Sequence, residues 1–554
     1  MPETKTYVSR RIRELLDIYT APDACAATLL CDRHDPDKRA YRIIAADLSA
    51  HDVTYGELRR DSERFANALA SLGIGAGDRV ATLMGKSREY LVALMGIWRL
   101  GAVHVPLFTA FAPPAIAFRL TGSGARMVIC DEGQRAKLVP GEHMPNNAEW
   151  RVITTGQAAE GALAFDGLVA GAAPGFVPAA PGGNAPIIHI YTSGTTGNPK
   201  GVIVPIRALA AFHAYGEFGQ GIRAGDDVFW CAADPGWAYG LYFGILVTLM
   251  TGVDSILLEA GFASEATFAV LEREEVTNFA AAPTVYRALR SSGIAPPGKL
   301  SLSRASSAGE PLTPEVNVWA EAALGVAVHD HYGQTEAGML INNHHHPAAS
   351  RPIREGSMGV AMPGWTAAIL KDEAEVEAQP GEPGRLAMDL PNCPLAWFDG
   401  YDGDPNKTSG KISADGRWYI TGDTGRVDED GYFYFSARDD DVIIMAGYRI
   451  GPFEVESVMA THPAVAECAV ISVPDEVRGE VIEAYVVTRE GQLGGAELEQ
   501  EIQQWVKRNY AAHAYPRKVH FAAAMPKTPS GKIQRFVLKR QRLDEIAQAA
   551  GNEP

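Results

Sequence analysis

The sequence has few cysteines and no long apolar run. Six cysteines are scattered over 554 residues without a CxxC pair, so we expect free thiols in a reducing compartment. The longest apolar run, residues 240–250, is too short to cross a bilayer. Residues 1–19 contain three acidic side chains and no apolar core, so they do not resemble a signal peptide. These absences predict a cytoplasmic protein without an integral membrane segment.

Basic residues are fewer than acidic residues. The chain has 50 Lys and Arg against 67 Asp and Glu, a net charge of −17, so neither nucleic acid nor an anionic membrane is an expected partner. An anionic substrate must then be bound by locally placed Lys and Arg side chains. Apolar residues make up 46% of the chain and charged residues 21%, as in a globular protein with a large core.

The most unusual stretch is YTSGTTGNPKG at residues 191–201, with four Ser/Thr hydroxyls, three glycines and one lysine. An apolar run precedes it and a helix-compatible run, residues 207–218, follows. We therefore expect a strand, a glycine-rich loop and a helix, an order that directs N–H groups and a lysine toward phosphate. It is not a Walker A loop, because Pro199 replaces its last glycine and Gly201 replaces the Ser/Thr that holds magnesium.

Apolar strands alternate with helices along most of the chain, which predicts parallel sheets in a three-layer α/β arrangement. A capping box at residues 54–57 begins the first clear helix, which ends before Gly73. Further helices are expected at residues 87–100 and 284–290. Strands are expected at residues 78–84, 101–105, 125–130, 227–230, 277–281, 302–307 and 326–330.

The pattern of predicted strands, helices and turns changes twice toward the C-terminus. From about residue 384, short strands and turns rich in Gly and Asp predict a β-rich end to the large domain. After the three acids at residues 439–441, the pattern is strand, helix, two strands, helix, strand. We therefore expect a large domain at residues 1–439 and a small α+β domain at residues 440–554, with the acidic run as a candidate hinge.

Four further stretches place polar residues where strands end. The turn at residues 307–311 lets a flat ring approach the backbone, and residues 330–336 supply an aromatic ring and Glu336, a hard oxygen ligand for Mg²⁺. Asp423 can accept hydrogen bonds from ribose hydroxyls. Lys532 lies in a loop rich in Pro, Ser and Gly that can swing. Each stretch by itself also fits an ordinary surface turn.

Taken together, these stretches resemble the core motifs of the adenylate-forming superfamily of acyl-CoA synthetases, peptide-synthetase adenylation domains and luciferases. The matching motifs are YTSGTTGNPKG, HYGQTEAG, YITGD, ARDDDV with AGYRIG, and PSGKIQR, in that order. The resemblance implies a large α/β domain with a β-rich subdomain and a small, mobile α+β C-terminal domain. It implies an enzyme that joins a carboxylate to the α-phosphate of ATP and then passes the acyl group to a thiol.

The resemblance also implies a role for each matching residue. The implied catalytic residues are Lys532, Glu336 and Thr335, and Glu336 is the implied ligand of Mg²⁺. The implied ATP- and AMP-binding residues are Thr192, Ser193, Gly194, Thr195, Thr196, Gly197, Lys200, Gly309, Glu310, Pro311, Asp330, Tyr332, Gln334, Asp423 and Arg438. The implied acyl pocket consists of Trp237, Ala238, Tyr239, Gly240, Ala308 and Gly333. The implied hinge is Asp440, and Gly447, Tyr448 and Arg449 are implied to line a tunnel for CoA.

The pattern DPGWAYG at residues 234–240 is similar to the acetyl- and medium-chain acyl-CoA synthetase branch. Acetate-specific members carry a tryptophan where this chain has Gly333, so the pocket is expected to take a medium-chain, branched or aromatic acid. Ala238 and Ala308 are small as well, whereas Tyr239 can narrow one wall. ATP, Mg²⁺ and CoA are the expected cofactor and co-substrates.

The alternative is an amino-acid or aryl-acid adenylating enzyme that passes its acyl group to a carrier protein, although no carrier domain is appended. A luciferase-like oxygenase is less favoured. A scaffold that lost catalysis is disfavoured because Lys532, Glu336 and Arg438 are intact. Three consecutive histidines, residues 344–346, are interpreted as a polar loop, because adjacent side chains cannot all face one metal ion on a regular element. No heptad pattern marks an oligomer interface.

Overall fold

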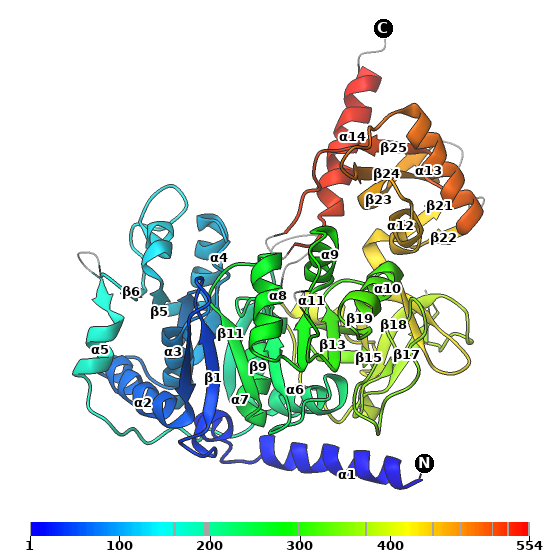
Figure 1. Cartoon of the computed structure of the whole chain (residues 1–554). Coiled ribbons are helices and arrows are strands. Elements are labelled where there is room, and N and C mark those ends of the chain that lie inside the picture. Colours follow the sequence, from blue (N-terminus) through cyan, green and yellow to red (C-terminus); the bar gives the residue numbers. More distant parts are fainter. Residues whose placement is uncertain are drawn as a thin grey trace.

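The computed structural model describes residues 2–158, 162–192, 199–296, 298–371, 374–445, 448–475, 479–511, 514–528 and 531–551. Figure 1 shows a large body, with the N-terminal helix at its base and a small lobe at the opposite end. The lobe contains the last strands and helices of the chain. The turn η7 (Asp439–Asp441) leads from the body into the lobe.

Two large sheets organise the body over the described residues. The first has seven strands and is parallel except for its last pair. Its order is β7 (Leu163–Ala164), β6 (Arg151–Thr154), β5 (Ala125–Cys130), β3 (Arg79–Leu83), β4 (Val103–Pro106), β8 (Pro186–Tyr191) and β9 (Gly201–Pro205). The second has nine strands, in the order β16 (Val360–Ala361), β15 (Gly338–Asn342), β14 (Val328–Gln334), β13 (Arg304–Ala308), β12 (Asn278–Ala281), β10 (Val228–Cys231), β11 (Asp254–Leu258), β1 (Arg39–Ile44) and β2 (Ala50–Thr54).

Helices cover both faces of each sheet, as the alternating pattern predicts, and the two sheets share one helical layer. The shared layer packs into the largest apolar core and contains α2 (Tyr55–Ser71), α3 (Arg88–Arg99), α6 (Leu209–Ala214), α7 (Val247–Thr251) and the π-helical turns η1 (Thr28–Asp32), η4 (Tyr215–Gly219) and η5 (Gly240–Leu246). The outer face of the nine-stranded sheet is covered by α8 (Ser264–Arg273), α9 (Pro283–Ser291) and α10 (Pro314–Ala323). The outer face of the other sheet is covered by α4 (Pro113–Ser123). The remaining helical segments of the body are α1 (Pro2–Tyr19), α5 (Phe165–Gly171), α11 (Pro405–Ser409), η2 (Glu132–Leu138), η3 (Ile206–Ala208) and η6 (Leu390–Asn392).

Capping residues in the sequence predicted where two helices begin. The Thr54 hydroxyl accepts a hydrogen bond from Glu57 N at 3.2 Å, and the Glu57 carboxylate accepts one from Thr54 N at 3.0 Å, which confirms the predicted capping box. Ser87 caps α3 in the same way, accepting from Tyr90 N at 3.1 Å. These caps satisfy backbone N–H groups that have no partner within the helix.

The β-rich end of the body begins earlier than predicted. Its antiparallel sheet consists of β17 (Ala367–Leu370), β18 (Gly384–Asp389), β19 (Trp418–Val427) and β20 (Phe433–Arg438). Strand β17 lies before residue 384, where this part of the body was expected to begin. It was not anticipated, because more than ten residues separate it from its partner β18.

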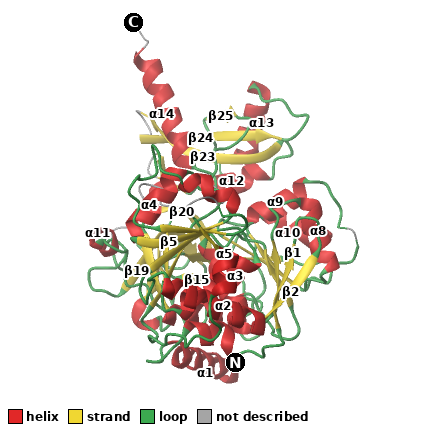
Figure 2. Cartoon of the chain, turned by 90° about the vertical axis from the view of Figure 1, so that its left-hand side faces the viewer, coloured by secondary structure: helices red, strands yellow, loops and turns green. Residues whose placement is uncertain are grey.

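The lobe follows the predicted order of elements and adds two. It contains β21 (Ile443–Met445), β22 (Tyr448–Ile450), α12 (Pro452–Ala460), β23 (Val465–Asp475), β24 (Gly479–Thr488), α13 (Ala496–Asn509), β25 (Lys518–Phe521) and α14 (Arg535–Gly551). Strand β22 and helix α14 were not anticipated. The lobe has its own apolar core, separate from those of the body, and Figure 2 shows it standing above the body from a second direction. Within the described residues, no helix is long and apolar enough to cross a membrane.

Two predictions about motif surroundings were wrong. The phosphate-type loop is followed directly by β9, which pairs with β8 as an antiparallel hairpin, and the helical run begins only at residue 206. The loop therefore does not open a helix. The strand expected to end at residue 330 continues as β14 through residue 334 and turns back as β15.

Candidate active site

The predicted site residues gather at the strand ends that face the lobe. Strands β13 and β14 are parallel neighbours, with Ala308 opposite His331, and β8 ends at Tyr191. Gly309, just beyond β13, has φ +105°, a conformation that strongly favours glycine. Ligands of open α/β sheets bind at this edge, where loops follow the carboxyl ends of strands.

The glycine-rich loop is described only at its two ends. Ser193, Gly194, Thr195, Thr196 and Gly197 lie outside the described residues. At the base of the loop, Thr192 N donates to Lys200 O at 2.9 Å. The Lys200 ammonium lies 4.9 Å from the centroid of the Tyr401 ring, which directs this cation toward the β-rich subdomain.

Glu336 is a buried carboxylate in the turn between β14 and β15. Its exposed fraction is 8%, and the Tyr401 hydroxyl donates to its Oε1 at 2.6 Å. Tyr242 fixes the same turn by donating to Thr335 O at 3.2 Å. Among the described residues, no Lys or Arg forms an ion pair with Glu336. A buried carboxylate held by a neutral donor matches the hard oxygen ligand that Mg²⁺ requires, so the donor chemistry fits this ion.

Asp423, in β19, is the most densely held carboxylate of the site. It is 3% exposed. Its Oδ2 accepts from the Tyr332 hydroxyl and from Gln334 Nε2 at 2.7 Å, and its Oδ1 lies 3.2 Å from Arg438 Nη1. Gln334 is itself fixed by Tyr419, whose hydroxyl donates to Gln334 Oε1 at 2.8 Å. Four predicted nucleotide residues therefore form one network.

The turn after β13 lies against a second carboxyl group. Glu310 pairs with Arg287 at 2.9 Å, and Leu312 N donates weakly to Asp330 Oδ2 at 3.5 Å. Burial raises the pKa of Asp330 to about 7. The predicted adenine slot, residues 309–311 with Asp330 and Tyr332, is thus brought together by β13 and β14.

Lys532 reaches the site from the lobe. Its Cε lies 3.9 Å from the position that a Cβ would take on Gly309. Displacement of water by surrounding protein lowers the pKa of Lys532; the carboxylates of Glu310 and Asp423 oppose this shift and Arg438 adds to it. The side chain keeps access to solvent on one side, as expected in a cleft between two domains. Hydrogen bonds from Thr528 N to Lys532 O at 2.7 Å and from Gly531 N to Thr528 O at 2.8 Å close the base of its loop.

The residues of the predicted acyl pocket face two directions. The Trp237 ring packs 5.3 Å from Phe108, beside the seven-stranded sheet. Tyr239 instead directs its hydroxyl to within 3.1 Å of the Tyr215 hydroxyl. Between them, Ala238 is partly buried, and Gly240 begins η5, where a Cβ would meet Asp234 O at 2.1 Å. Ala308 is buried at the end of β13.

Gly333 lies at a register shift in the β14–β15 hairpin. A Cβ on this residue would lie 2.2 Å from Gly338 O and 2.6 Å from Met339 Sδ. Any side chain at this position would therefore first have to displace β15.

The hinge and tunnel residues are described in part. Asp440 lies in η7, between β20 and β21. Gly447 lies outside the described residues, and the backbones of Tyr448 and Arg449 form β22, which pairs with β21. Their proposed contacts with CoA stay predictions.

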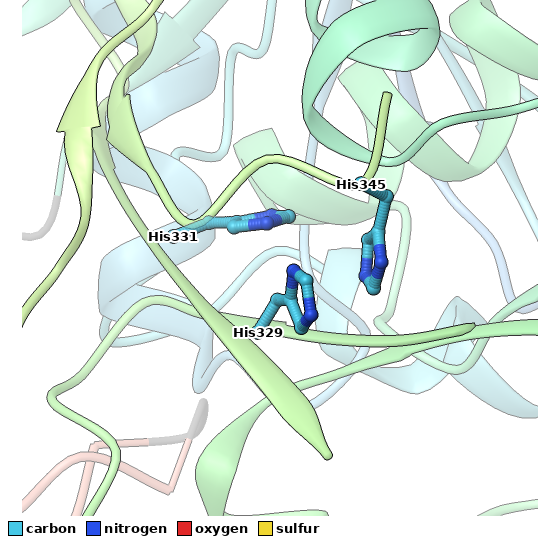
Figure 3. Close-up of side chains that lie close together, drawn as sticks. All are labelled: His329, His331 and His345. Carbon is cyan, nitrogen blue, oxygen red and sulfur yellow. The ribbon is translucent and has the colours of Figure 1, made fainter. Parts of the chain in front are cut away.

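The histidine run lies in a loop, as predicted, but it is not exposed: His344 is buried, and His345 and His346 are half-buried. His345 stacks on His329, with ring centroids 3.6 Å apart and planes inclined by 12°, and His331 lies beside them (Figure 3). His329 Nδ1 and His331 Nε2 both donate to Asn343 O, at 2.7 and 3.0 Å. Rings that are nearly parallel cannot both direct their in-plane lone pairs at one ion, so stacking and hydrogen bonds account for this cluster.

Sequence reasoning missed Tyr401, Tyr419 and Lys411. The Lys411 ammonium donates to Thr421 O at 2.6 Å, two residues before Asp423. Tyr419 is the first residue of the YITGD motif, but no role was assigned to it, whereas Tyr401 and Lys411 belong to none of the quoted motifs. The sequence signal of these two residues is their position in the segment that leads into β19, and that signal is too weak to select them.

Comparison with known proteins places this geometry in a family. The AMP-binding enzyme family matches residues 31–398, and the C-terminal domain of AMP-binding enzymes matches residues 454–532. The acetyl-coenzyme A synthetase of Bacillus subtilis is 35% identical over 499 residues, 89% of this chain and 85% of that protein. A crystal structure of Brucella canis acyl-CoA synthetase is 44% identical, covers 96% of this chain and 97% of its own, and has a TM-score of 0.73. A benzoate CoA ligase from Burkholderia xenovorans LB400 is 29% identical, with coverages of 93% and 99% and a TM-score of 0.81.

The chain therefore belongs to the AMP-binding enzymes of the adenylate-forming superfamily. Within that superfamily it falls in the acyl-CoA synthetase branch, the acid–CoA ligases that cleave ATP to AMP.

Proposed function

We propose that this acyl-CoA synthetase activates a medium-chain, branched or aromatic carboxylic acid. The observation that carries the proposal is Gly333. Acetate-specific members of the superfamily cap the acyl pocket with a tryptophan at this position, and this chain has a glycine there, so the cap is missing. Small residues at Ala238 and Ala308 support a longer cavity. The similarity to a benzoate CoA ligase supports an aromatic acid among the candidates.

In the first half-reaction, a carboxylate oxygen attacks the α-phosphorus of ATP, and pyrophosphate leaves with the bridging oxygen. The two reactants are both anions, and their repulsion amounts to about 4 kcal/mol at 4 Å for unit charges near a protein surface. The ammonium of Lys532 offsets this repulsion and stabilises the charge that develops on the bridging oxygen. Its position beside Gly309, facing Asp423 and Arg438, supports this role.

The other nucleotide contacts follow from the same network. Asp423, held by Tyr332 and Arg438, accepts the ribose hydroxyls, and the glycine-rich loop with Lys200 holds the departing pyrophosphate. Glu336 is the proposed ligand of Mg²⁺, which when bound spreads the negative charge of the triphosphate. Thr335 contacts the α-phosphate.

In the second half-reaction, the sulfur of CoA attacks the acyl carbon, the bond to AMP breaks and the thiol proton is released. Lys532 occupies the approach to that carbon during the first step. We propose that the lobe rotates about Asp440, withdraws Lys532 and presents residues 447–449 to the pantetheine chain. The separate core of the lobe and its short connection through η7 support movement as a unit.

A panel of acids tests the substrate class. ATP, Mg²⁺ and CoA are supplied with acids from acetate to decanoate and with branched and aromatic acids, and thioester, AMP and pyrophosphate are measured. We expect kcat/KM for acetate to be lowest, with AMP and thioester formed in equal amounts. A preference for acetate would refute the pocket proposal.

The same assay separates the alternative function. Pyrophosphate exchange that depends on an amino acid or aryl acid, without thioester formation from free CoA, would favour transfer to a carrier protein. We also propose a cytoplasmic location, which the six free, buried cysteines support.

A further inference from the structure

Lys411 is a cation inside the nucleotide site that no motif of the superfamily led us to expect. It follows α11, which lies beside β19 in both views (Figures 1 and 2), and its backbone carbonyl accepts from Ile420 N at 2.7 Å. The ammonium donates to Thr421 O at 2.6 Å, and Gln334 Nε2 donates to the same oxygen at 2.9 Å. Lys411 is thus attached to the network that holds Asp423.

The surroundings of the ammonium are charged on several sides. Burial lowers the pKa of Lys411; the carboxylates of Glu336 and Asp423 oppose this shift, and the cations of Arg438 and Lys200 reinforce it. The groups that act on this ammonium are therefore the proposed metal ligand Glu336, the proposed ribose acceptor Asp423 with its partner Arg438, and Lys200 of the proposed phosphate loop. It lies 5.6 Å from the centroid of the Tyr419 ring, which covers another side.

The ammonium of Lys411 has three N–H donors, and Thr421 O accepts from one of them. The carboxylates of Glu336 and Asp423 and the cations of Lys200 and Arg438 all act on it. A largely buried cation with further donors favours a nearby anion. The polyanion that the superfamily binds here is the phosphate chain of ATP.

We propose that Lys411 is a further nucleotide-binding residue whose ammonium contacts a phosphate oxygen of ATP. Thr421 O holds the ammonium in place, and an ammonium with three donors can keep that bond while it donates to phosphate. This inference rests on the assignment of Glu336 and Asp423 to the nucleotide site. It adds a contact from the segment before β19, which no motif covers.

Binding measurements on three variants test the proposal. Lys411→Gln removes the charge but keeps a donor for Thr421 O, and Lys411→Arg keeps the charge. Lys407→Gln is the matched control, because Lys407 is exposed in the same segment and pairs with Asp404 at 2.8 Å. Calorimetry measures binding of adenosine, AMP and a non-hydrolysable ATP analogue with Mg²⁺ to the full-length enzyme. Thermal unfolding checks that each variant is folded.

We expect Lys411→Gln to weaken binding of the ATP analogue about tenfold or more, to leave adenosine within about twofold, and to be rescued in part by Lys411→Arg. Lys407→Gln is expected to bind all three ligands like the wild type. Weaker AMP binding as well would assign the contact to the α-phosphate, and unchanged AMP binding would assign it to the β- or γ-phosphate. Wild-type affinity of Lys411→Gln for the ATP analogue, or an equal loss for adenosine, would overturn the proposal. A wild-type enzyme that binds no ATP would instead refute the assignment of the nucleotide site.

Discussion

At the scale of single residues, the site consists of carboxylates that neutral donors hold in place. Tyr401 donates to Glu336, and Tyr332 and Gln334 donate to Asp423. Neutral donors orient Glu336 without cancelling its charge, so this carboxylate remains available to a metal ion. Asp423 also pairs with Arg438, at 3.2 Å. Cations enter from other elements: Lys200 beside β9, Arg438 at the end of β20 and Lys532 from the lobe.

The first prediction concerns Lys532. Lys532→Ala is expected to reduce ATP–pyrophosphate exchange by roughly 100- to 1,000-fold, because the charge that offsets the two reacting anions is lost. Thioester formation from supplied acyl-adenylate should be largely preserved. Lys527→Ala is the matched control, since Lys527 lies in the same loop but pairs with Glu467 at 2.7 Å. Equal loss of both half-reactions in a folded Lys532→Ala variant would argue against two domain orientations.

A second prediction concerns the donor to Glu336. Tyr401→Phe is expected to raise the Mg²⁺ concentration for half-maximal activity about 10- to 100-fold, because the carboxylate loses the hydroxyl that orients it. The phenyl ring still packs beside Lys200. Tyr432→Phe serves as control, since that hydroxyl donates to Pro352 O at 2.8 Å, away from the site. An unchanged Mg²⁺ requirement would remove Glu336 from the metal site.

At the scale of elements, the β14–β15 hairpin carries most of the predicted chemistry. Asp330, Tyr332 and Gln334 lie on β14, and Glu336 lies in the turn. The antiparallel pairing fixes the spacing of these side chains, which a free loop would not. Gly333 makes the close approach of the two strands possible.

The third prediction tests this packing. Gly333→Ala is expected to destabilise the body by about 1 to 3 kcal/mol and to lower activity, because the added Cβ meets the β15 backbone. Differential scanning fluorimetry measures the change. Gly133→Ala is the control, since a Cβ there has nothing within 4 Å. A wild-type midpoint for Gly333→Ala would mean that the hairpin opens easily and that bulkier substitutions at this position report on the acyl pocket after all.

At the scale of the whole molecule, the body encloses several histidines whose pKa is lowered by burial. Burial lowers the pKa of His331 and His345 well below the ordinary value, and that of His344 to about 4. The folded state then binds fewer protons than the unfolded state. The stability that these groups contribute is complete above the ordinary pKa of about 6.5 and is lost as pH falls toward the lowered values.

The fourth prediction concerns the loss of stability as the pH falls. Lowering the pH from about 7.5 to about 5 is expected to reduce the unfolding midpoint of the body. His345→Asn should make the midpoint less dependent on pH across this window, because one buried titrating ring is removed. His143→Asn, at an exposed position, should leave the dependence unchanged. If His345→Asn keeps the full pH dependence, other groups dominate the acid response.

Much of the fold followed from local patterns. The helix starts at Thr54 and Ser87 were readable because caps lie next to the helices they begin. Strand β5 was located to the residue, since a buried strand is a continuous apolar run between turn signals. Strand β9 was missed because it is only five residues long and follows a loop whose composition indicated a helix N-terminus.

The sequence by itself determined the family, the order of the motifs and the residues with reactive groups, because each motif is contiguous and its spacing is visible along the chain. Only the tertiary structure decided which of these groups meet. Tyr401 and Glu336 are 65 positions apart, and Lys411 and Gln334 are joined through their shared acceptor, Thr421 O. Such contacts depend on how the sheets and the lobe pack together. Residues that are far apart in the sequence and meet only through packing produce no periodic pattern along the chain.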